Sequence, residues 1–173
     1  TFIHPWDFIQ RDSHPNDVYG HGTHVAGTIA QTTNNGIGTA GIAYNAKIMP
    51  LRVLDSRGEG DSAAIARAIR YAVRYHADVI NLSLEFPAEV RSAEIPDVVS
   101  ALHLAHRRGV FVVAAAGNQT DITVVYPARV KSVVAVGATT DDGCQADYSN
   151  GGRDLDVAAP GGGVDAPNTD SVW

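Results

Sequence analysis

A histidine between two glycines is the first residue of this sequence with an obvious chemical use. His21 stands in the segment Tyr-Gly-His-Gly-Thr-His, and small residues follow it in a run with helical character. An imidazole acts as a general base only where a rigid, closely packed backbone holds it near a nucleophile. Gly22, Ala26 and Gly27 permit such packing at the start of a helix. The segment therefore suits a catalytic base, although a lone histidine is more often structural.

A second histidine lies three residues further along the chain. His21 and His24 form a His-x-x-His pair, which is also found in some zinc sites. No third ligand follows at zinc spacing and no glutamate separates the two, so zinc is only a minor alternative. Only one imidazole can serve as the base, and we expect His24 to have a structural role.

An asparagine at the end of an apolar run is the second candidate for chemistry. The run Phe111-Val112-Val113-Ala114-Ala115-Ala116 leads into Gly117 and Asn118. At the end of a buried strand, the side-chain amide of Asn118 can donate a hydrogen bond to an oxyanion that develops in acyl transfer. Taken alone, Asn118 would be read as a turn residue after a strand, which is common.

The elements that must position these residues alternate between two patterns. Apolar, β-branched runs predict strands at 46–54, 78–84, 110–115, 133–137 and 155–158, and helical spacing predicts helices at 62–75 and 96–108. Gly109 follows the second helix as a natural C-cap. This alternation predicts an α/β fold with a mostly parallel sheet, in which sites gather at the carboxyl ends of the strands.

The two motifs together resemble those of a known family. The segment 19–30 with His21, the segment 114–118 with Asn118, and the late segments 132–138 and 156–161 resemble subtilisin-like serine peptidases (subtilases, peptidase family S8), most closely the thermitase-like members. The resemblance implies a three-layer subtilisin-like fold with a mostly parallel sheet flanked by helices, truncated at both ends. It also implies a serine-type endopeptidase with acyl-enzyme chemistry, in which His21 is the base and Asn118 the oxyanion donor.

Two members of the family's catalytic triad have no match in this sequence. The triad runs Asp, His, Ser along the chain, but Asp7 and Asp12 do not follow the apolar strand that precedes the triad aspartate in the family, and Ser171 lies in no nucleophile context. We therefore expect residues 1–173 to be the central part of one catalytic domain, and to be inactive as they stand. The alternative is a catalytically inactive pseudo-peptidase that binds peptides.

The resemblance also implies a binding groove for protein or peptide substrates in extended conformation. Its residues would be Ser83, Leu84, Glu85, Ala115, Ala116 and Gly117. The strand before Glu85 would pair with the substrate backbone, and the small residues would form a wall that suits large apolar side chains. Glu85 replaces the family's usual glycine. Its carboxylate could favour basic substrate side chains, narrow the cleft, or simply point to solvent. A propeptide or an inhibitor is a further partner that the family suggests.

Calcium is the cofactor that the resemblance implies. Asp7, Asp12 and Asn16 would give side-chain oxygens and His14 its carbonyl, since hard cations take several oxygen ligands. A second loop would use the side chain of Asn35 and the backbone carbonyls of Thr32, Ile37 and Thr39. This second site lacks acidic residues, so we expect it to be weak or empty. The alternative is that the acidic and amide residues of the first loop only stabilise a turn.

Composition excludes several other classes of protein. The chain has 173 residues, with 13 Lys and Arg against 19 Asp and Glu and a formal charge of -6, and no basic run that would favour nucleic acid. No apolar stretch reaches the length of a membrane span, and no signal peptide opens the sequence; the family implies secretion. The single cysteine, Cys144, is read as an incidental thiol.

A glycine-rich segment offers one more alternative. Residues 36–41 satisfy the pattern Gly-x-Gly-x-x-Gly, which in dinucleotide-binding folds follows a strand and opens a helix. Here a helix precedes the glycines and a strand follows them. The reversed order argues against nucleotide binding.

Overall fold

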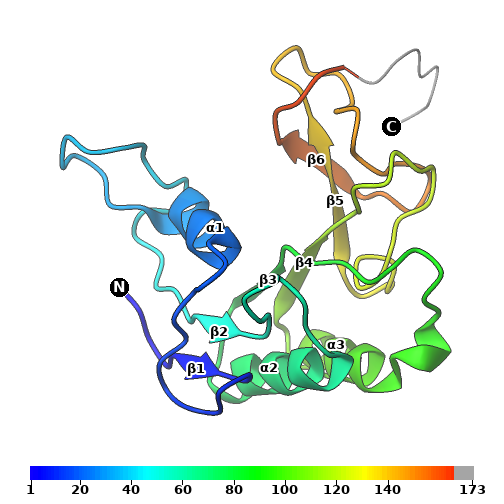
Figure 1. The fold of residues 1–173 in the computed structure, drawn as a ribbon. Coiled ribbons are helices and arrows are strands. Elements are labelled where there is room, and N and C mark those ends of the chain that lie inside the picture. Colours follow the sequence, from blue (N-terminus) through cyan, green and yellow to red (C-terminus); the bar gives the residue numbers. More distant parts are fainter. Residues whose placement is uncertain (166–173) are drawn as a thin grey trace. The chain divides into compact units, whose positions relative to one another are not determined.

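The chain folds into two compact units, each with its own parallel sheet (Figure 1). The computed structural model describes residues 1–165. The first unit spans Thr1–Ala77 and the second begins at Asp78. Ser171, which the sequence places outside any nucleophile motif, lies beyond the described residues. No helix within residues 1–165 is long and apolar enough to cross a membrane.

The first unit contains two short strands and two helices. These are β1 (Trp6–Asp7), α1 (His21–Ala30), β2 (Leu51–Arg52) and α2 (Ser62–Arg74). β1 pairs with β2 in parallel, with Trp6 opposite Leu51. The strand predicted at 46–54 is therefore much shorter than expected. Pro50 has no N–H to give to a ladder, and Ile48 makes only an isolated bridge with Phe2.

Helix α2 confirms the helix predicted at 62–75. The side chain of Asp61 caps its first turn by accepting a hydrogen bond from the Ala64 N–H at 2.5 Å. Its apolar face is buried and its arginines are exposed, as the spacing predicted. On the same helix, Tyr71 stacks on Trp6 with a ring-centroid distance of 6.2 Å and meets Phe8 edge-on at 5.8 Å, which fixes β1 beside α2.

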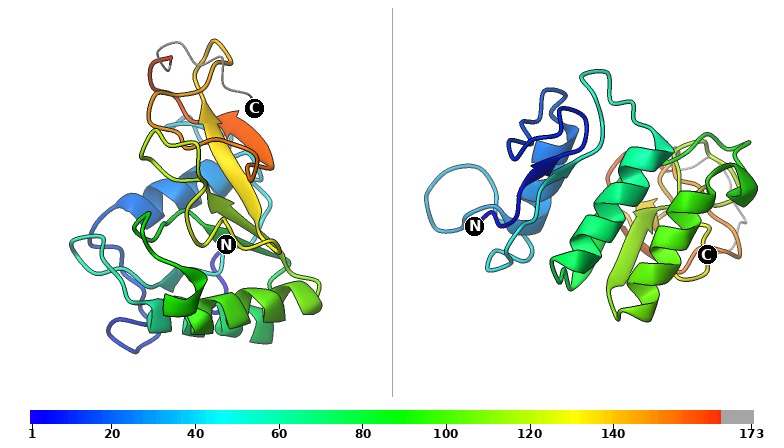
Figure 2. Two further views of the ribbon diagram at one scale, coloured as in Figure 1. Left: turned by 90° about the vertical axis from the view of Figure 1, so that its right-hand side faces the viewer. Right: turned by 90° about the horizontal axis from the view of Figure 1, so that it is seen from below.

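The second unit is built around four parallel strands. Its elements are β3 (Val79–Leu82), the 3-10 turn η1 (Ser92–Glu94), α3 (Pro96–Arg107), β4 (Phe111–Ala115), β5 (Val134–Thr139) and β6 (Val157–Pro160). The strands lie in the order β3-β4-β5-β6 and run in one direction. The left view of Figure 2 shows β5 (yellow) between β4 (green) and β6 (orange). The α/β fold class predicted from the alternation of apolar runs and helices is confirmed.

Helix α3 has both of its predicted ends. Pro96 occupies the first turn, where a missing N–H costs no hydrogen bond. At the other end Gly109 takes a φ of 75° and donates to the His106 carbonyl, while the Val110 N–H donates to the Ala105 carbonyl, both at 3.0 Å. These two bonds form a Schellman motif, which ends the helix and turns the chain into β4. Leu102 on α3 and Val112 on β4 are both buried in this unit.

The register of the second sheet brings two predicted site segments to one edge. Leu82 at the end of β3 lies opposite Ala114 near the end of β4. The residues that follow both strands therefore leave the same, carboxyl, edge of the sheet, which is where ligands bind in parallel sheets.

Candidate active site

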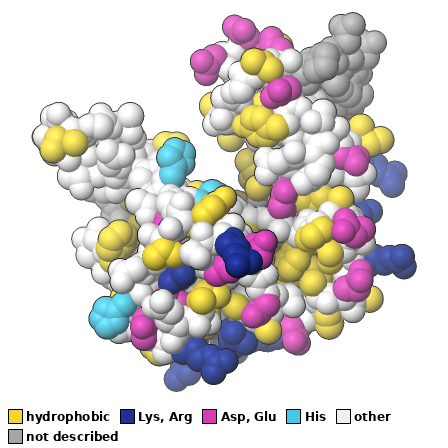
Figure 3. Space-filling model, in the orientation of Figure 1, with side chains coloured by type: hydrophobic (Ala, Val, Ile, Leu, Met, Phe, Trp, Pro, Cys, Tyr) yellow, Lys and Arg dark blue, Asp and Glu magenta, His cyan; other side chains and the backbone are white. Residues whose placement is uncertain are grey.

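His21 is the first residue of helix α1, as predicted. Gly20 precedes it with a φ of 97°, a left-handed conformation that glycine adopts without strain. The side chains of His21 and His24 are both exposed, and histidine side chains are visible at the surface in Figure 3. An exposed imidazole on the first turn of a helix is accessible to a reacting group.

Asp17 fixes the start of helix α1, a role that the sequence analysis missed. One carboxylate oxygen accepts from the N–H of Tyr19 at 3.0 Å and of Gly20 at 2.8 Å. The other accepts from the N–H and the hydroxyl of Thr23, both at 2.7 Å. Burial alone would raise the pKa of Asp17, but the bonds from Gly20, Thr23 and Tyr19 hold this pKa well below its ordinary value of 3.8. Asp17 thus replaces the side-chain cap that Gly20 cannot provide.

Replacing Asp17 with alanine is expected to lower the free energy of unfolding by about 1 kcal/mol, the usual value of a helix cap. Because the pKa of Asp17 is lower in the folded state than in the unfolded state, its stabilisation is complete above pH 4. It is lost as the pH falls through the folded-state pKa. Urea unfolding of the wild type and of Asp17→Ala between pH 3 and pH 7 measures the difference. Asp17→Asn, which keeps one acceptor oxygen, should lie between them. A difference that grows toward acid would contradict this account.

Asn118 lies directly beyond the carboxyl end of β4, as predicted. Gly117 before it has a φ of 119°, which a residue with a side chain would adopt only with strain. The amide of Asn118 is exposed, and its Nδ2 donates to Glu85 Oε2 at 3.3 Å. Asn118 and Glu85 belong to the second unit, whereas His21 belongs to the first.

The six residues predicted to bind substrate gather at the same edge of the second sheet. Ser83, Leu84 and Glu85 continue β3, which is an edge strand of the sheet in this unit. Ala115 ends β4, and Ala116 and Gly117 are buried behind it. The juxtaposition follows from the parallel pairing of β3 with β4. Their roles in binding remain predictions.

Asn150 holds the loop that carries Asn118, and the sequence analysis did not single it out. Its side chain is fully buried. Its Oδ1 accepts from the N–H groups of Gln119 at 2.9 Å and Asp121 at 3.0 Å. Its Nδ2 donates to Gln119 Oε1 at 2.8 Å and to the Thr123 carbonyl at 3.1 Å. A buried amide with this many partners fixes the backbone on both sides of the loop. The only signal in the sequence is the polar run 148–152, which resembles an ordinary turn.

The first predicted calcium loop is held together by its own hydrogen bonds. Asp7 is fully buried, and its carboxylate accepts from Arg52 Nη1 at 2.9 Å and from the N–H groups of Ile9 and Gln10. Asp12 and Asn16 are partly or fully exposed, and the His14 carbonyl accepts from the Asn16 N–H at 2.7 Å. Asp7 therefore already has a cationic partner. The remaining oxygens are fewer than the six to eight that calcium takes.

The second predicted calcium loop shows local turn bonds. Asn35 Oδ1 accepts from the Ile37 N–H at 3.1 Å, and the Thr39 hydroxyl donates to Gln31 Oε1 at 3.3 Å. Thr32 lies just beyond helix α1 in the same loop. Within residues 1–165 no three His, Cys, Asp or Glu side chains lie close enough together to hold a metal ion.

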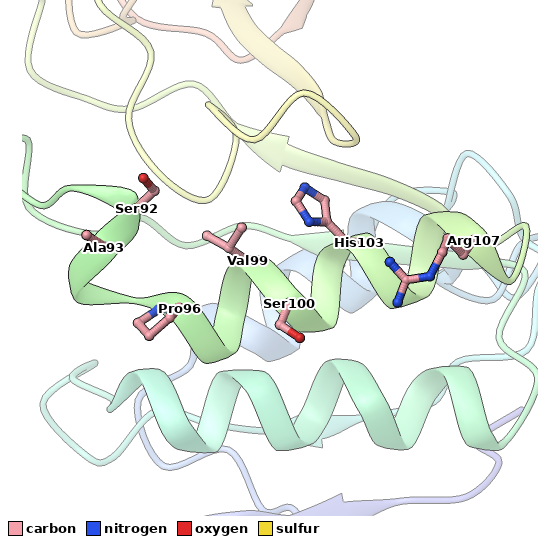
Figure 4. Close-up of a pocket in the computed structure, with 7 residues that line it drawn as sticks. All are labelled: Ser92, Ala93, Pro96, Val99, Ser100, His103 and Arg107. Atoms are coloured by element: carbon pink, nitrogen blue, oxygen red, sulfur yellow. The ribbon is translucent and has the colours of Figure 1, made fainter.

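An open pocket of about 350 Å³ lies elsewhere in the second unit (Figure 4). It is lined by η1 and one face of α3, from Ser92 to Arg107, and includes His103. None of the predicted catalytic or substrate-binding residues lines it. We therefore place the candidate site at the carboxyl edge of the sheet, where the polar side chains converge.

The fold and the site define the chain as an α/β protein with a candidate site at the carboxyl ends of parallel strands. Residues 1–172 match the model of the Subtilase family, Peptidase_S8, and the chain belongs to this family. It is 43% identical over 159 residues to the thermophilic serine proteinase of Bacillus sp. (strain AK1) and 42% identical over 156 residues to thermitase of Thermoactinomyces vulgaris. The predicted resemblance is confirmed.

Solved structures agree with this assignment. A protease from Pseudoalteromonas arctica superposes with a TM-score of 0.84 at 35% identity, over 94% of this chain and 58% of that one. A cold-adapted subtilisin-like serine proteinase gives 0.78 at 33% identity, over 92% and 55%. The two sequence matches, to the Bacillus proteinase and to thermitase, cover 92% and 90% of this chain but only 38% and 54% of those relatives. The chain thus spans about half or less of the length of these two relatives.

Proposed function

We propose that the protein containing this chain is a serine endopeptidase that cleaves peptide bonds through an acyl-enzyme. The observation that carries the proposal is the exposed amide of Asn118 beside the segment that follows β3, at the carboxyl edge of the sheet. Membership of the subtilase family and the names of the relatives, a serine proteinase and thermitase, support it. His21 and Asn118 are the two catalytic residues we assign to this chain.

In the proposed reaction a serine hydroxyl attacks the carbonyl carbon of the substrate. His21 takes the hydroxyl proton as the Oγ–C bond forms, and Asn118 Nδ2 donates a hydrogen bond to the oxyanion. The proton then passes from His21 to the leaving amine as the C–N bond breaks, and water releases the acyl group by the same steps. The serine and the aspartate that orients His21 have no match in these 173 residues. We propose that these residues alone form no acyl-enzyme.

Labelling with a fluorophosphonate tests this function. Intact mass spectrometry of the source protein, before and after exposure, should show a mass above 18.2 kDa and one covalent adduct. The isolated 173 residues serve as the control and should show none. An unlabelled source protein that binds peptides without cleaving them would instead identify an inactive pseudo-peptidase.

We further propose an extended protein or peptide segment as the substrate, paired to the backbone of β3. Within the described residues of the second unit β3 lies at the edge of its sheet, which supports this mode of binding. Action outside the cell is supported by a relative that is 43% identical, the cell wall-associated protease of Bacillus subtilis. A propeptide or inhibitor would occupy the same edge.

For calcium we propose weak binding at the loop of Asp12, His14 and Asn16, with water supplying the other oxygens. Asp7 would hold the loop through its bonds to Ile9, Gln10 and Arg52. Free calcium at about ten times its dissociation constant would then raise the free energy of unfolding by about 1.4 kcal/mol. Asp12→Asn should abolish this increase, whereas Asp142→Asn, an exposed residue elsewhere, should leave it unchanged. Thermal unfolding with and without calcium measures it. Equal stabilisation in the wild type and Asp12→Asn would move the ion to another site.

A further inference from the structure

Glu85 makes the most unusual contact at the candidate site. Its half-buried carboxylate accepts from Gln119 Nε2 at 2.6 Å and from Asn118 Nδ2 at 3.3 Å. Both donors are neutral amides, and no Lys or Arg pairs with Glu85 in the part of the chain that the structure describes. The carboxylate therefore does not simply point to solvent. The carboxylate of Glu85 is hydrogen-bonded directly to the Asn118 amide, the group that we assign as the oxyanion donor.

This contact conflicts with the proposed role of Asn118. The amide nitrogen has two hydrogens, and Glu85 attracts one of them. A negative charge this close also repels a second negative charge that develops at the same amide, because like charges a few ångströms apart interact strongly in the effective dielectric of a protein. As long as Glu85 carries an uncompensated charge, Asn118 is a poor oxyanion donor.

A positive charge from the substrate would remove the conflict. Ala115, at the carboxyl end of β4, is a small and partly exposed residue of the same sheet edge, whereas Ala116 and Gly117 behind it are buried. A long aliphatic stem would lie along this edge to reach the carboxylate. Lysine and arginine side chains combine such a stem with a charged end. A neutral apolar side chain of the same length would fill the space but leave the carboxylate uncompensated.

We infer that Glu85 selects substrates with a lysine or arginine next to the bond that is cleaved, and that this cation frees Asn118 to stabilise the oxyanion. The inference rests on the proposed peptidase function. It assigns to Glu85 a role in specificity through a contact with substrate, and it makes the substrate's own charge part of the catalytic site.

Two matched peptides test the inference, one with lysine and one with norleucine before the scissile bond. Norleucine has the lysine stem without the ammonium group. With the complete source protein, kcat/KM should be about tenfold higher for the lysine peptide than for the norleucine peptide. A hydrogen bond to a charged group contributes enough free energy for about this factor. In Glu85→Gln this ratio should fall to about one, and norleucine cleavage should become faster. Glu89→Gln, an equal change of charge on an exposed residue of the same segment, should keep the wild-type ratio.

A lysine-to-norleucine ratio of one or less in the wild type, or a ratio unchanged in Glu85→Gln, would overturn the inference while cleavage itself still supports the peptidase. Fluorescence anisotropy with the same two peptides separates the two proposals if no cleavage occurs. A lysine preference in binding that Glu85→Gln abolishes would support recognition by Glu85 and refute the peptidase. Equal binding of both peptides would overturn the inference as well.

Discussion

Replacing Asn150 with alanine is expected to lower the free energy of unfolding by about 3 kcal/mol or more, and to remove the contribution of Asn118 to catalysis. Asn150 is fully buried and its amide joins the loop after β4 to the segment before β6. Alanine would leave the N–H groups of Gln119 and Asp121 and the Thr123 carbonyl without their partner. These three bonds are partly buried, so each group that loses its partner should cost about 1 kcal/mol, the low end of the range for buried groups.

The loop would also lose its shape. Gly117 and Gln119 flank Asn118, and both are bound to Asn150: the Asn150 N–H donates to the Gly117 carbonyl at 3.0 Å, and its side chain bonds Gln119. An oxyanion donor works only when it is held in place before the reaction. We therefore expect kcat to fall together with stability in Asn150→Ala.

Asn118→Ala is the matched control, because it removes the same type of side chain at an exposed position in the loop that Asn150 holds. Its stability should change by no more than about 0.5 kcal/mol, as is usual for surface substitutions. Its kcat should fall by about 10²–10³, a value measured for the oxyanion asparagine in this same family. Urea unfolding and peptide hydrolysis of both variants give the comparison. A stability of Asn150→Ala within 1 kcal/mol of the wild type would disprove the structural role.

The sequence predicted the elements whose signals are local. The apolar face of α2 and the glycine that ends α3 were both predicted, because the spacing of apolar residues indicates a helix face and a glycine after it indicates a C-cap. The predicted strand at 46–54 shrank to two residues at β2, and β1 was not predicted at all. Strands this short are defined by their pairing partner, which the sequence pattern does not reveal.

The residues of the candidate site also fall into those that the sequence predicted and those that it missed. His21 and Asn118 were predicted from motifs, whereas Asp17 and Asn150 were missed since polar residues in loops look alike until their partners are known. Glu85 is the intermediate case. The sequence left three meanings for its carboxylate, and only the pairing of β3 with β4 shows that it reaches Asn118.

His21→Ala in the complete protein is expected to have the largest effect on activity. Without the imidazole no group takes the proton from the serine hydroxyl or returns one to the leaving amine. Loss of the catalytic histidine lowers kcat by about 10⁶ in a member of this same family, and we expect a loss of that order here. The fluorophosphonate adduct should disappear with it, because the unactivated serine does not react.

The fold should tolerate this change. His21 is exposed, and its side chain makes no hydrogen bond within the residues that the structure describes, so thermal unfolding should be unaltered. His24→Ala, one turn further along the exposed face of α1, should keep activity within about tenfold because only one imidazole acts as the base. If His21→Ala retained more than about one per cent of the wild-type kcat, or if His24→Ala lost as much as His21→Ala, the assignment of the base to His21 would be wrong. Loss of activity in His21→Ala alone, with the fold intact, is the result that only direct participation of this imidazole in proton transfer explains.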